Sequence, residues 1–269
     1  MTSLFIKQLL CTLLLLSILP LSIQAKESNS VEDTVMNFAL GFWQQNTEQV
    51  LNPLHPALSK KGIKRNWRKS GKEIMATLPP DRLEILATVY NSEGRLNDIS
   101  KPKVYLHEVN EHFASLELVN DDWYDFFHAV KLDGEWKLLN CVYGKGREYP
   151  LPKSQEDTQA INAVIDHFVA GLAGDADKLS NSTHINLERR KFATSKSKQR
   201  YIKPIAREQM ISNAGTFEFD VNDVKIELYN HTNRTAAARI DFGKWQEHVQ
   251  LLKINEQWFI VNSFVLKYN

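Results

Sequence analysis

The sequence contains one pattern twice, and this repeat limits what the chain can fold into more than any other feature. A shift of 122 positions superposes two tryptophans, a lysine and an asparagine, namely Trp123, Lys131, Trp136 and Asn140 onto Trp245, Lys253, Trp258 and Asn262. The same shift places Asp125 on Glu247, and a shift of 129 places His55 on His184. Self-similarity of this kind is typical of a duplicated fold. We therefore expect the same domain in two copies.

The first 25 residues have the pattern of a secretory signal peptide. Lys7 is the only charge before Lys26, residues 9–19 are largely apolar, and Ala25 ends the segment. This order predicts cleavage after Ala25 and a periplasmic or secreted protein. A retained anchor is the alternative, although the apolar run is shorter than the roughly 20 residues that a spanning helix needs. After cleavage we expect no stable membrane span.

A connector is predicted near residue 150. Residues 144–152 are polar and carry two glycines and two prolines, and such stretches interrupt regular structure. Ser154 and Asp157 then have the spacing that caps a new helix. We expect a signal peptide at 1–25, a first domain at 26–147, a linker at 148–153 and a second domain at 154–269.

Each predicted domain begins with helices and ends with strands. Apolar residues recur at helical spacing over 31–42 and 161–172, and the change to a strand-like period comes later in each half. Further helices are expected at 47–52, 71–90, 175–181 and 205–213. Strands are expected at 104–106, 113–119, 123–132 and 135–143, with a hairpin turn at Asp133-Gly134. This order predicts the α+β class with antiparallel sheets.

Charge and cysteine content narrow the range of partners. The chain has 33 Lys and Arg against 32 Asp and Glu, so we expect no nucleic-acid partner. Cleavage after Ala25 would remove Cys11 and leave Cys141 alone, which excludes an intramolecular disulfide. Cys141 lies in strand-like apolar sequence, where a buried inert thiol is the interpretation preferred to a nucleophile.

The hairpin and the first histidine carry a family resemblance. Residues 125–136 read Asp-Phe-Phe-His-Ala-Val-Lys-Leu-Asp-Gly-Glu-Trp, and His55-Pro56 follows the second predicted helix. These features resemble the nuclear transport factor 2-like superfamily, and more narrowly its lumazine-binding branch, in tandem duplicate. The second half matches the branch less well, because Ile185 replaces the proline and Glu256 replaces the turn glycine.

The resemblance implies two tandem cone-shaped domains. In each, a curved antiparallel sheet would wrap about three helices and leave a pocket at its open end. It implies little about activity, because this fold carries dehydratases, isomerases, cyclases and many proteins that are not enzymes.

His55 and Asp125 are the candidate catalytic residues. A histidine and a carboxylate in one pocket could transfer protons. Strand alternation places Asp125 on the same face as Phe127 and Lys131, and places His128 on the opposite face. In the structural alternative, His55 anchors the corner between helix and loop, and Asp125 orients it.

Nine further residues are candidates for ligand binding because they are polar or aromatic and mostly belong to the repeated hairpins. They are Trp123, Tyr124, His128, Lys131, His184, Trp245, Glu247, His248 and Lys253. Core packing is the alternative for the tryptophans, since both halves keep them at one spacing. Tyr124, Phe126 and Val130 share the outer face of their strand, which predicts that the two halves pack as an internal pseudo-dimer.

Two basic runs occupy corresponding places, at 60–69 and 188–200. They are interpreted either as solvated loops or as groups that neutralise an anionic ligand at a pocket mouth. No metal site is expected, because His107 and His112 have one residue too many between them for a zinc helix motif. No cofactor motif was found.

Three functions stay open at this stage. The first is an exported, non-catalytic protein whose tandem domains bind a small ligand or a protein partner. The second is a dehydratase or isomerase that uses His55 with Asp125. The third is a structural protein whose pockets are filled by side chains.

Overall fold

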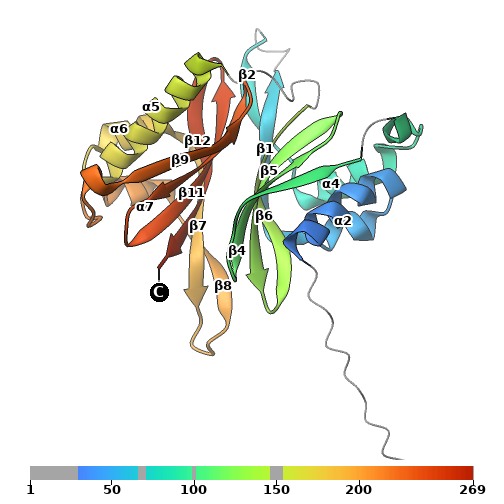
Figure 1. The fold of residues 1–269 in the computed structure, drawn as a ribbon, viewed down its shortest axis with the longest axis horizontal. Helices are drawn as coiled ribbons and strands as arrows, with labels where there is room; N and C mark the ends of the chain where they lie inside the picture. Colours follow the sequence, from blue (N-terminus) through green and yellow to red (C-terminus); the bar gives the residue numbers. More distant parts are fainter. Residues whose placement is uncertain (1–29, 66–70, 99–100, 146–153, 269) are drawn as a thin grey trace, which may run out of the picture.

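The computed structural model describes residues 30–65, 71–98, 101–145 and 154–268. The predicted signal peptide at 1–25 and the predicted linker at 148–153 lie outside these ranges. Within them, no helix is both long and apolar enough to cross a lipid bilayer. The described chain forms two tandem α+β halves, each with a curved six-stranded sheet and helices on one face (Figure 1).

The described part of the first half contains three α-helices, one 3-10 helix and six strands. In chain order they are α2 (Val31–Gln44), α3 (Thr47–Leu51), β1 (Leu54–Arg65), β2 (Glu73–Thr77), α4 (Pro80–Val89), η1 (Arg95–Asp98), β3 (Lys103–Val109), β4 (Phe113–Val119), β5 (Trp123–Leu132) and β6 (Glu135–Lys145).

The second half repeats this order of elements. They are α5 (Gln155–Leu172), α6 (Ala176–Ser182), β7 (Thr183–Thr194), β8 (Arg200–Ile205), α7 (Arg207–Ser212), η3 (Val221–Asp223), β9 (Lys225–His231), β10 (Thr235–Asp241), β11 (Trp245–Ile254) and β12 (Gln257–Lys267).

The strand order confirms the duplication. The first sheet runs β2-β1-β6-β5-β4-β3, and the second runs β8-β7-β12-β11-β10-β9. Neighbouring strands are antiparallel, as expected, except that β1 pairs in parallel with β6 and β7 pairs in parallel with β12. In each half this first strand follows a short helix and lies beside the last strand of the half.

Most predicted elements are confirmed, and one region is wrong. The expected helix at 71–90 is instead the strand β2 followed by the shorter helix α4, which begins at Pro80. The strands β1 and β7 were not expected, because paired basic residues interrupt their apolar sequence. Ser154 caps α5, since its Oγ accepts from the Asp157 backbone N–H at 2.9 Å.

The two hairpin turns adopt the conformation that their sequences predict. Asp133 and Gly134 both have positive φ, at 50° and 82°, which is the combination a two-residue hairpin turn requires. Asn255 and Glu256 have φ of 49° and 64° in the second half. Glutamate seldom adopts such a φ, and here its carboxylate is held by the Lys253 ammonium at 3.0 Å.

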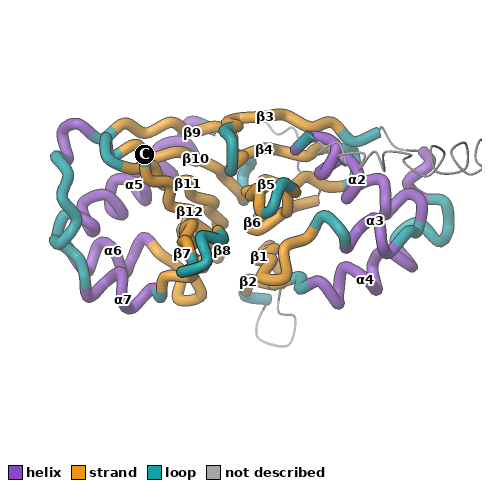
Figure 2. Tube along the Cα trace, turned by 90° about the horizontal axis from the view of Figure 1, so that it is seen from below, coloured by secondary structure: helices purple, strands orange, loops and turns teal. Residues whose placement is uncertain are grey.

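Each half buries its own core between the helices and the inner face of its sheet. In the first half, Phe38 of α2 meets Phe127 of β5 edge to face, with ring centroids 5.6 Å apart. In the second half, Phe168 of α5 occupies the equivalent place. The helices therefore lie on the outside of the molecule and the two sheets face each other, as Figure 2 shows.

The outer faces of the two sheets form the boundary between the halves, here called the seam. Two apolar clusters in the seam draw residues from both halves, and one of them joins Phe113 and Val130 to Phe264. The rings of Phe113 and Phe264 stack with centroids 5.0 Å apart. The expected packing of the halves on each other is thus observed, with Tyr124, Phe126 and Val130 facing the partner half as strand alternation predicts.

Replacement of Phe113 tests this packing. Phe113 is fully buried and contacts His248 and Phe264 of the other half. We expect Phe113→Ala to lower the free energy of unfolding by about 3–5 kcal/mol, measured by urea denaturation. The control Tyr105→Ala, at a side chain about half exposed, should change it by less than about 0.5 kcal/mol. An equal effect of the two variants would contradict the assignment of Phe113 to the seam.

Candidate functional site

The strands β1 and β7 carry pairs of cations that the sheet separates. Successive side chains of a strand point to opposite faces. In β1, Lys60 therefore points into the first half and Lys61 points into the seam. Arg189 and Arg190 divide in the same way in β7. All four side chains are buried, so the interpretation of these positions as solvated loops is wrong. The remainder of the first basic run, at 66–69, lies outside the described residues.

Lys60 forms a buried ion pair with Asp125 inside the first half. The ammonium also lies 3.3 Å from the Cys141 sulfur and near the rings of Phe38 and Phe127. Burial alone lowers the pKa of Lys60, but the Asp125 carboxylate outweighs burial and the pKa is raised. Burial raises the pKa of the Cys141 thiol well above its usual range. The thiol is therefore protonated, as an inert structural cysteine would be.

The second half contains an equivalent buried ion pair that is made of different residues. Arg189 replaces Lys60, Glu247 replaces Asp125 and Ser263 replaces Cys141. The guanidinium holds the carboxylate by two hydrogen bonds of 2.8 and 2.9 Å, and Ser263 donates a third at 2.7 Å. Both oxygens of the Glu247 carboxylate therefore accept hydrogen bonds from buried groups of their own half.

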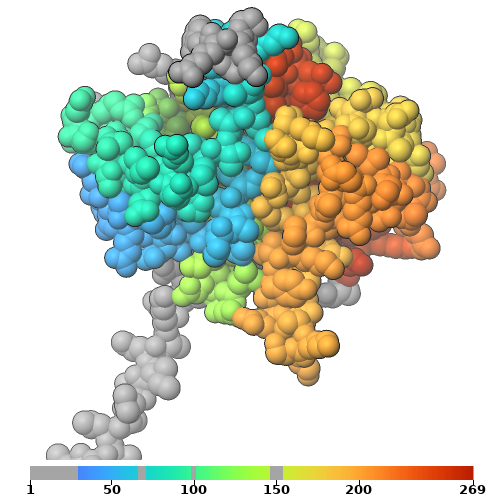
Figure 3. All heavy atoms as spheres, turned by 180° about the vertical axis from the view of Figure 1, so that it is seen from behind, coloured from blue at the N-terminus to red at the C-terminus, as the bar shows by residue number. Residues whose placement is uncertain are grey.

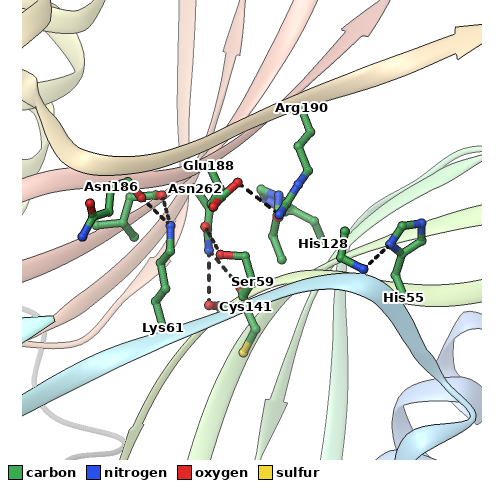
Figure 4. A network of polar contacts seen from close by, with 12 residues as sticks. His55, Ser59, Lys61, His128, Cys141, Asn186, Glu188, Arg190 and Asn262 are labelled. Carbon is green, nitrogen blue, oxygen red and sulfur yellow. Dashed lines mark hydrogen bonds and ion pairs between the residues drawn. The ribbon is translucent and has the colours of Figure 1, made fainter. Parts of the chain in front are cut away.

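The other two cations reach across the seam, as Figure 4 shows. Lys61 donates to the backbone carbonyls of Asn186 and Val261 in the second half, at 2.8 Å each. Arg190 donates to the side-chain oxygen of Asn140 in the first half. Its other nitrogen lies 3.2 Å from the Glu188 carboxylate. Each half therefore sends one cation into its partner.

An amide and a hydroxyl link the halves beside these cations. Ser59 donates to the Asn262 side-chain oxygen at 2.9 Å. The Asn262 amide in turn donates to the Cys141 carbonyl at 3.2 Å and to Gln250 at 2.9 Å. Asn140 and Asn262 are the repeated asparagines of the sequence pattern, so the duplication preserves a contact between halves.

A hollow of about 340 Å³ opens at this point of the seam. It is lined by Leu58, Ser59, Lys61, Met75, Thr77, Asn186, Leu187, Glu188 and Arg190. The space-filling view of Figure 3 shows the blue β1 segment meeting the yellow to orange β7 segment along the seam. The volume lies at the lower end of the range for small-molecule sites. The hollow lies between the halves rather than in a cone.

Two cations determine the electrostatics of the hollow. The pKa of Lys61 is lowered to about 7, mainly by burial, with a smaller contribution from Arg190, and the Glu188 carboxylate opposes the shift. Lys61 therefore changes its charge near neutral pH. No carboxylate among the described residues lies within ion-pair distance of its ammonium.

His55 and His184 make matching hydrogen bonds to the backbone and take no part in the buried ion pairs. The Nδ1 of His55 accepts from the Ala57 N–H at 3.0 Å, and the Nδ1 of His184 accepts from the Asn186 N–H at 3.1 Å. Burial lowers the pKa of both imidazoles, and a cation of the opposite half adds to each shift. Asp125 is bound by Lys60 and shares no hydrogen bond with His55 within the described chain.

His128 and His248 lie in the seam. His128 Nδ1 contacts the Asn140 amide at 3.2 Å, and His248 packs on the Phe113 ring at 4.4 Å. Burial lowers the pKa of His248 to about 3 and lowers that of His128 well below its usual value. Both rings are therefore neutral at physiological pH.

The remaining sequence candidates pack within or between the halves. Trp123 contacts Phe42, Trp43 and Tyr90, whereas Trp245 stacks on Phe242. Tyr124 bonds Thr232 across the seam at 3.0 Å. Lys131 lies over the Trp136 ring, and Lys253 pairs with Asp157 at 3.1 Å.

None of the sequence candidates is among the residues that line the hollow. Lys61 and Arg190 line it instead, and the sequence had placed them only within the two basic runs, interpreted either as solvated loops or as groups that neutralise an anionic ligand. Their signal was the pair of basic runs at equivalent positions. The described residues contain no group of three or more His, Cys, Asp or Glu side chains that could hold a metal ion.

Comparison with known proteins returns matches of structure only. No protein-family model matches the chain, and no curated protein matches it in sequence. A nuclear transport factor 2-like protein of unknown function from Silicibacter pomeroyi covers 44% of this chain and 100% of its own, with 12% identity and a TM-score of 0.36. One from Shewanella baltica covers 45% and 90%, with 14% identity and a TM-score of 0.32.

A ketosteroid isomerase-like protein from Erwinia carotovora covers 45% of this chain and 97% of its own, with 12% identity and a TM-score of 0.30. Each match thus spans about one half of the chain. Two of these three structures carry the superfamily name that the sequence resemblance suggested, and none of the three addresses the lumazine-binding branch.

The buried ion pairs generate the first prediction of this site. Asp125→Asn leaves the Lys60 ammonium buried without a counter-charge, so we expect a loss of about 3–5 kcal/mol in the free energy of unfolding. Replacing both partners, as in Lys60→Met with Asp125→Leu, should recover most of that loss. Urea denaturation measures both, and Glu227→Gln at a half-exposed pair serves as the control. A harmless single variant would contradict the role of the pair.

The seam histidines generate a pH dependence. Their pKa values are lower in the folded chain than the roughly 6.5 of an unfolded histidine, so the unfolded chain binds protons first as the pH falls. Stability is complete above about pH 6.5 and falls by about 1.4 kcal/mol per pH unit for each such histidine. For His248 this loss extends down to about pH 3.

Chemical denaturation at a series of pH values measures this slope. In His248→Gln the free energy of unfolding should fall less steeply as the pH is lowered below about 6.5. His167→Gln, on the exposed face of α5, should leave this slope unchanged. An unaltered slope in His248→Gln would show that the ring is protonated in the folded chain.

Proposed function

We propose that this chain is an exported, non-catalytic binding protein whose duplicated domains hold a small ligand or a protein partner. The buried ion pairs carry this proposal. Asp125 and Glu247 are the carboxylates that could have served as acid or base in the two halves, and each is bound by a buried cation of its own half. A general base needs a carboxylate that can reach a substrate proton, and these two are committed to structure.

The proposal of export depends on the sequence of residues 1–25, with its basic start, apolar middle and small final residue. We propose cleavage after Ala25 and a periplasmic or secreted location. Cleavage there would remove Cys11 and leave the buried Cys141 without a second thiol for a disulfide, which is compatible with an oxidising compartment.

The enzymatic alternative requires Asp125 to leave Lys60 and join His55. A dehydratase or isomerase of this kind would keep a carboxylate and an imidazole within hydrogen-bond reach of one substrate. The contacts of His55, which accepts from a backbone N–H two residues on, favour a structural role for the ring.

Native mass spectrometry of protein purified from its source tests the proposal. We expect a mature chain that begins at Lys26 and carries a bound small molecule or a partner chain, and that leaves the molecule unchanged on incubation. His55→Ala and the matched His184→Ala should lower stability by similar amounts, since both rings make the same backbone contact. Turnover that is lost in His55→Ala while the circular dichroism spectrum is retained would contradict the proposal.

A further inference from the structure

We propose that the hollow between the halves is a binding site for a small organic anion, and that the Glu188 carboxylate occupies its charge-binding position when no ligand is present. This inference deepens the proposed function and rests on it, because it names the place and the chemical class of the ligand.

The first argument is the charge balance of the four buried cations. Lys60 and Arg189 each face one buried carboxylate, so the interior of each half is neutral. Lys61 instead faces two backbone carbonyls, which supply dipoles but no negative charge. Arg190 faces a neutral asparagine and the Glu188 carboxylate. The hollow thus has two cations and one anion, and a bound carboxylate would complete the balance.

The second argument is the way in which Glu188 is held. Its side chain is 45% exposed, whereas that of Arg190 is 7% exposed. The contact uses one guanidinium nitrogen at 3.2 Å, which is longer than the usual charge-assisted bond of about 2.7–2.9 Å. The bidentate Arg189–Glu247 pair in the interior shows the tighter geometry. A loosely held, half-exposed carboxylate costs little to displace.

The third argument is the asymmetry of the duplicated strands. The position of Glu188 in β7 is occupied in β1 by Ser59, which is neutral. The carboxylate is therefore present in one half and has no counterpart at the equivalent position of the other. Ser59 donates to Asn262 and so belongs to the structural contact between the halves.

The lining of the hollow limits the ligand to a small molecule with an apolar body. Leu58, Met75 and Leu187 provide apolar walls, and Thr77 adds a hydroxyl. A volume of about 340 Å³ suits a ring or a short aliphatic chain better than a nucleotide. We infer a monocarboxylate with an apolar or flat aromatic body as the ligand class.

Titration calorimetry with benzoate, and with benzamide as its neutral counterpart, tests the site in the whole protein. We expect benzoate to bind and benzamide not to bind. Glu188→Gln removes the competing carboxylate, so benzoate affinity should rise by about tenfold, the change that about 1.4 kcal/mol produces. Glu227→Gln removes a half-exposed acid of β9 that pairs with Arg239 of β10, and should leave the affinity unchanged.

A second variant and a pH series address the cation. Lys61→Met keeps the length of the side chain and removes its charge, and should abolish binding while circular dichroism shows an intact fold. Wild-type affinity should weaken as the pH rises through about 7, because Lys61, which lies among Arg190, His184 and Glu188, then loses its proton.

Several outcomes would overturn the site. Absence of benzoate binding to both wild-type and Glu188→Gln protein would do so, as would equal binding of benzamide, or a Glu188→Gln affinity no higher than wild type. Should a ligand co-purify with the native protein and yet be unaffected by Lys61→Met, the proposed function would stand and this site would fall. A turnover lost in His55→Ala would instead remove the proposed function.

Discussion

The structure depends on the burial of two pairs of cations, one pair at adjacent positions in each of the strands β1 and β7. A buried charge is costly unless a partner compensates for it, so each cation of β1 and β7 fixes the position of its acceptors. Two of them pair with a carboxylate that lies two strands away in their own sheet. The other two require groups from the opposite half. Two adjacent residues therefore fix contacts both in the interior of one half and between that half and the other.

Much of the fold could be predicted from the sequence, because its signals are local or repeated. The stripe of Val35, Phe38 and Phe42 predicts a helix, the alternation over β5 predicts which face is buried, and the repeat predicts two halves. The strand alternation also placed Asp125 and His128 on opposite faces, and the structure confirms this. These features follow from periodicity, which a single sequence contains in full.

The candidate site could not be predicted to the same extent, for two physical reasons. A run such as Lys60-Lys61 is usually solvated, and only the parallel pairing of β1 with β6 shows that it is buried. The partners of Lys61 are backbone carbonyls some 125 and 200 residues away, and carbonyls leave no mark in a sequence. His55 became a candidate because His184 repeats it in the second half. Both histidines accept a backbone N–H, and neither forms an acid–base pair with the repeated carboxylates.

His55 and His184, which accept backbone hydrogen bonds, lie where the register of β1 and β7 shifts. Each lies inside the irregularity that precedes the parallel pairing, between Leu54 and Ser59 in the first half and between Thr183 and Glu188 in the second. A slip of one residue in a strand exchanges its two faces. It would turn Lys60 toward the partner half and Lys61 toward Asp125. The hydrogen bond from the Ala57 N–H to the His55 imidazole lies within the stretch that precedes this choice of faces, so the course of the backbone there bears on which of two neighbouring lysines meets a carboxylate.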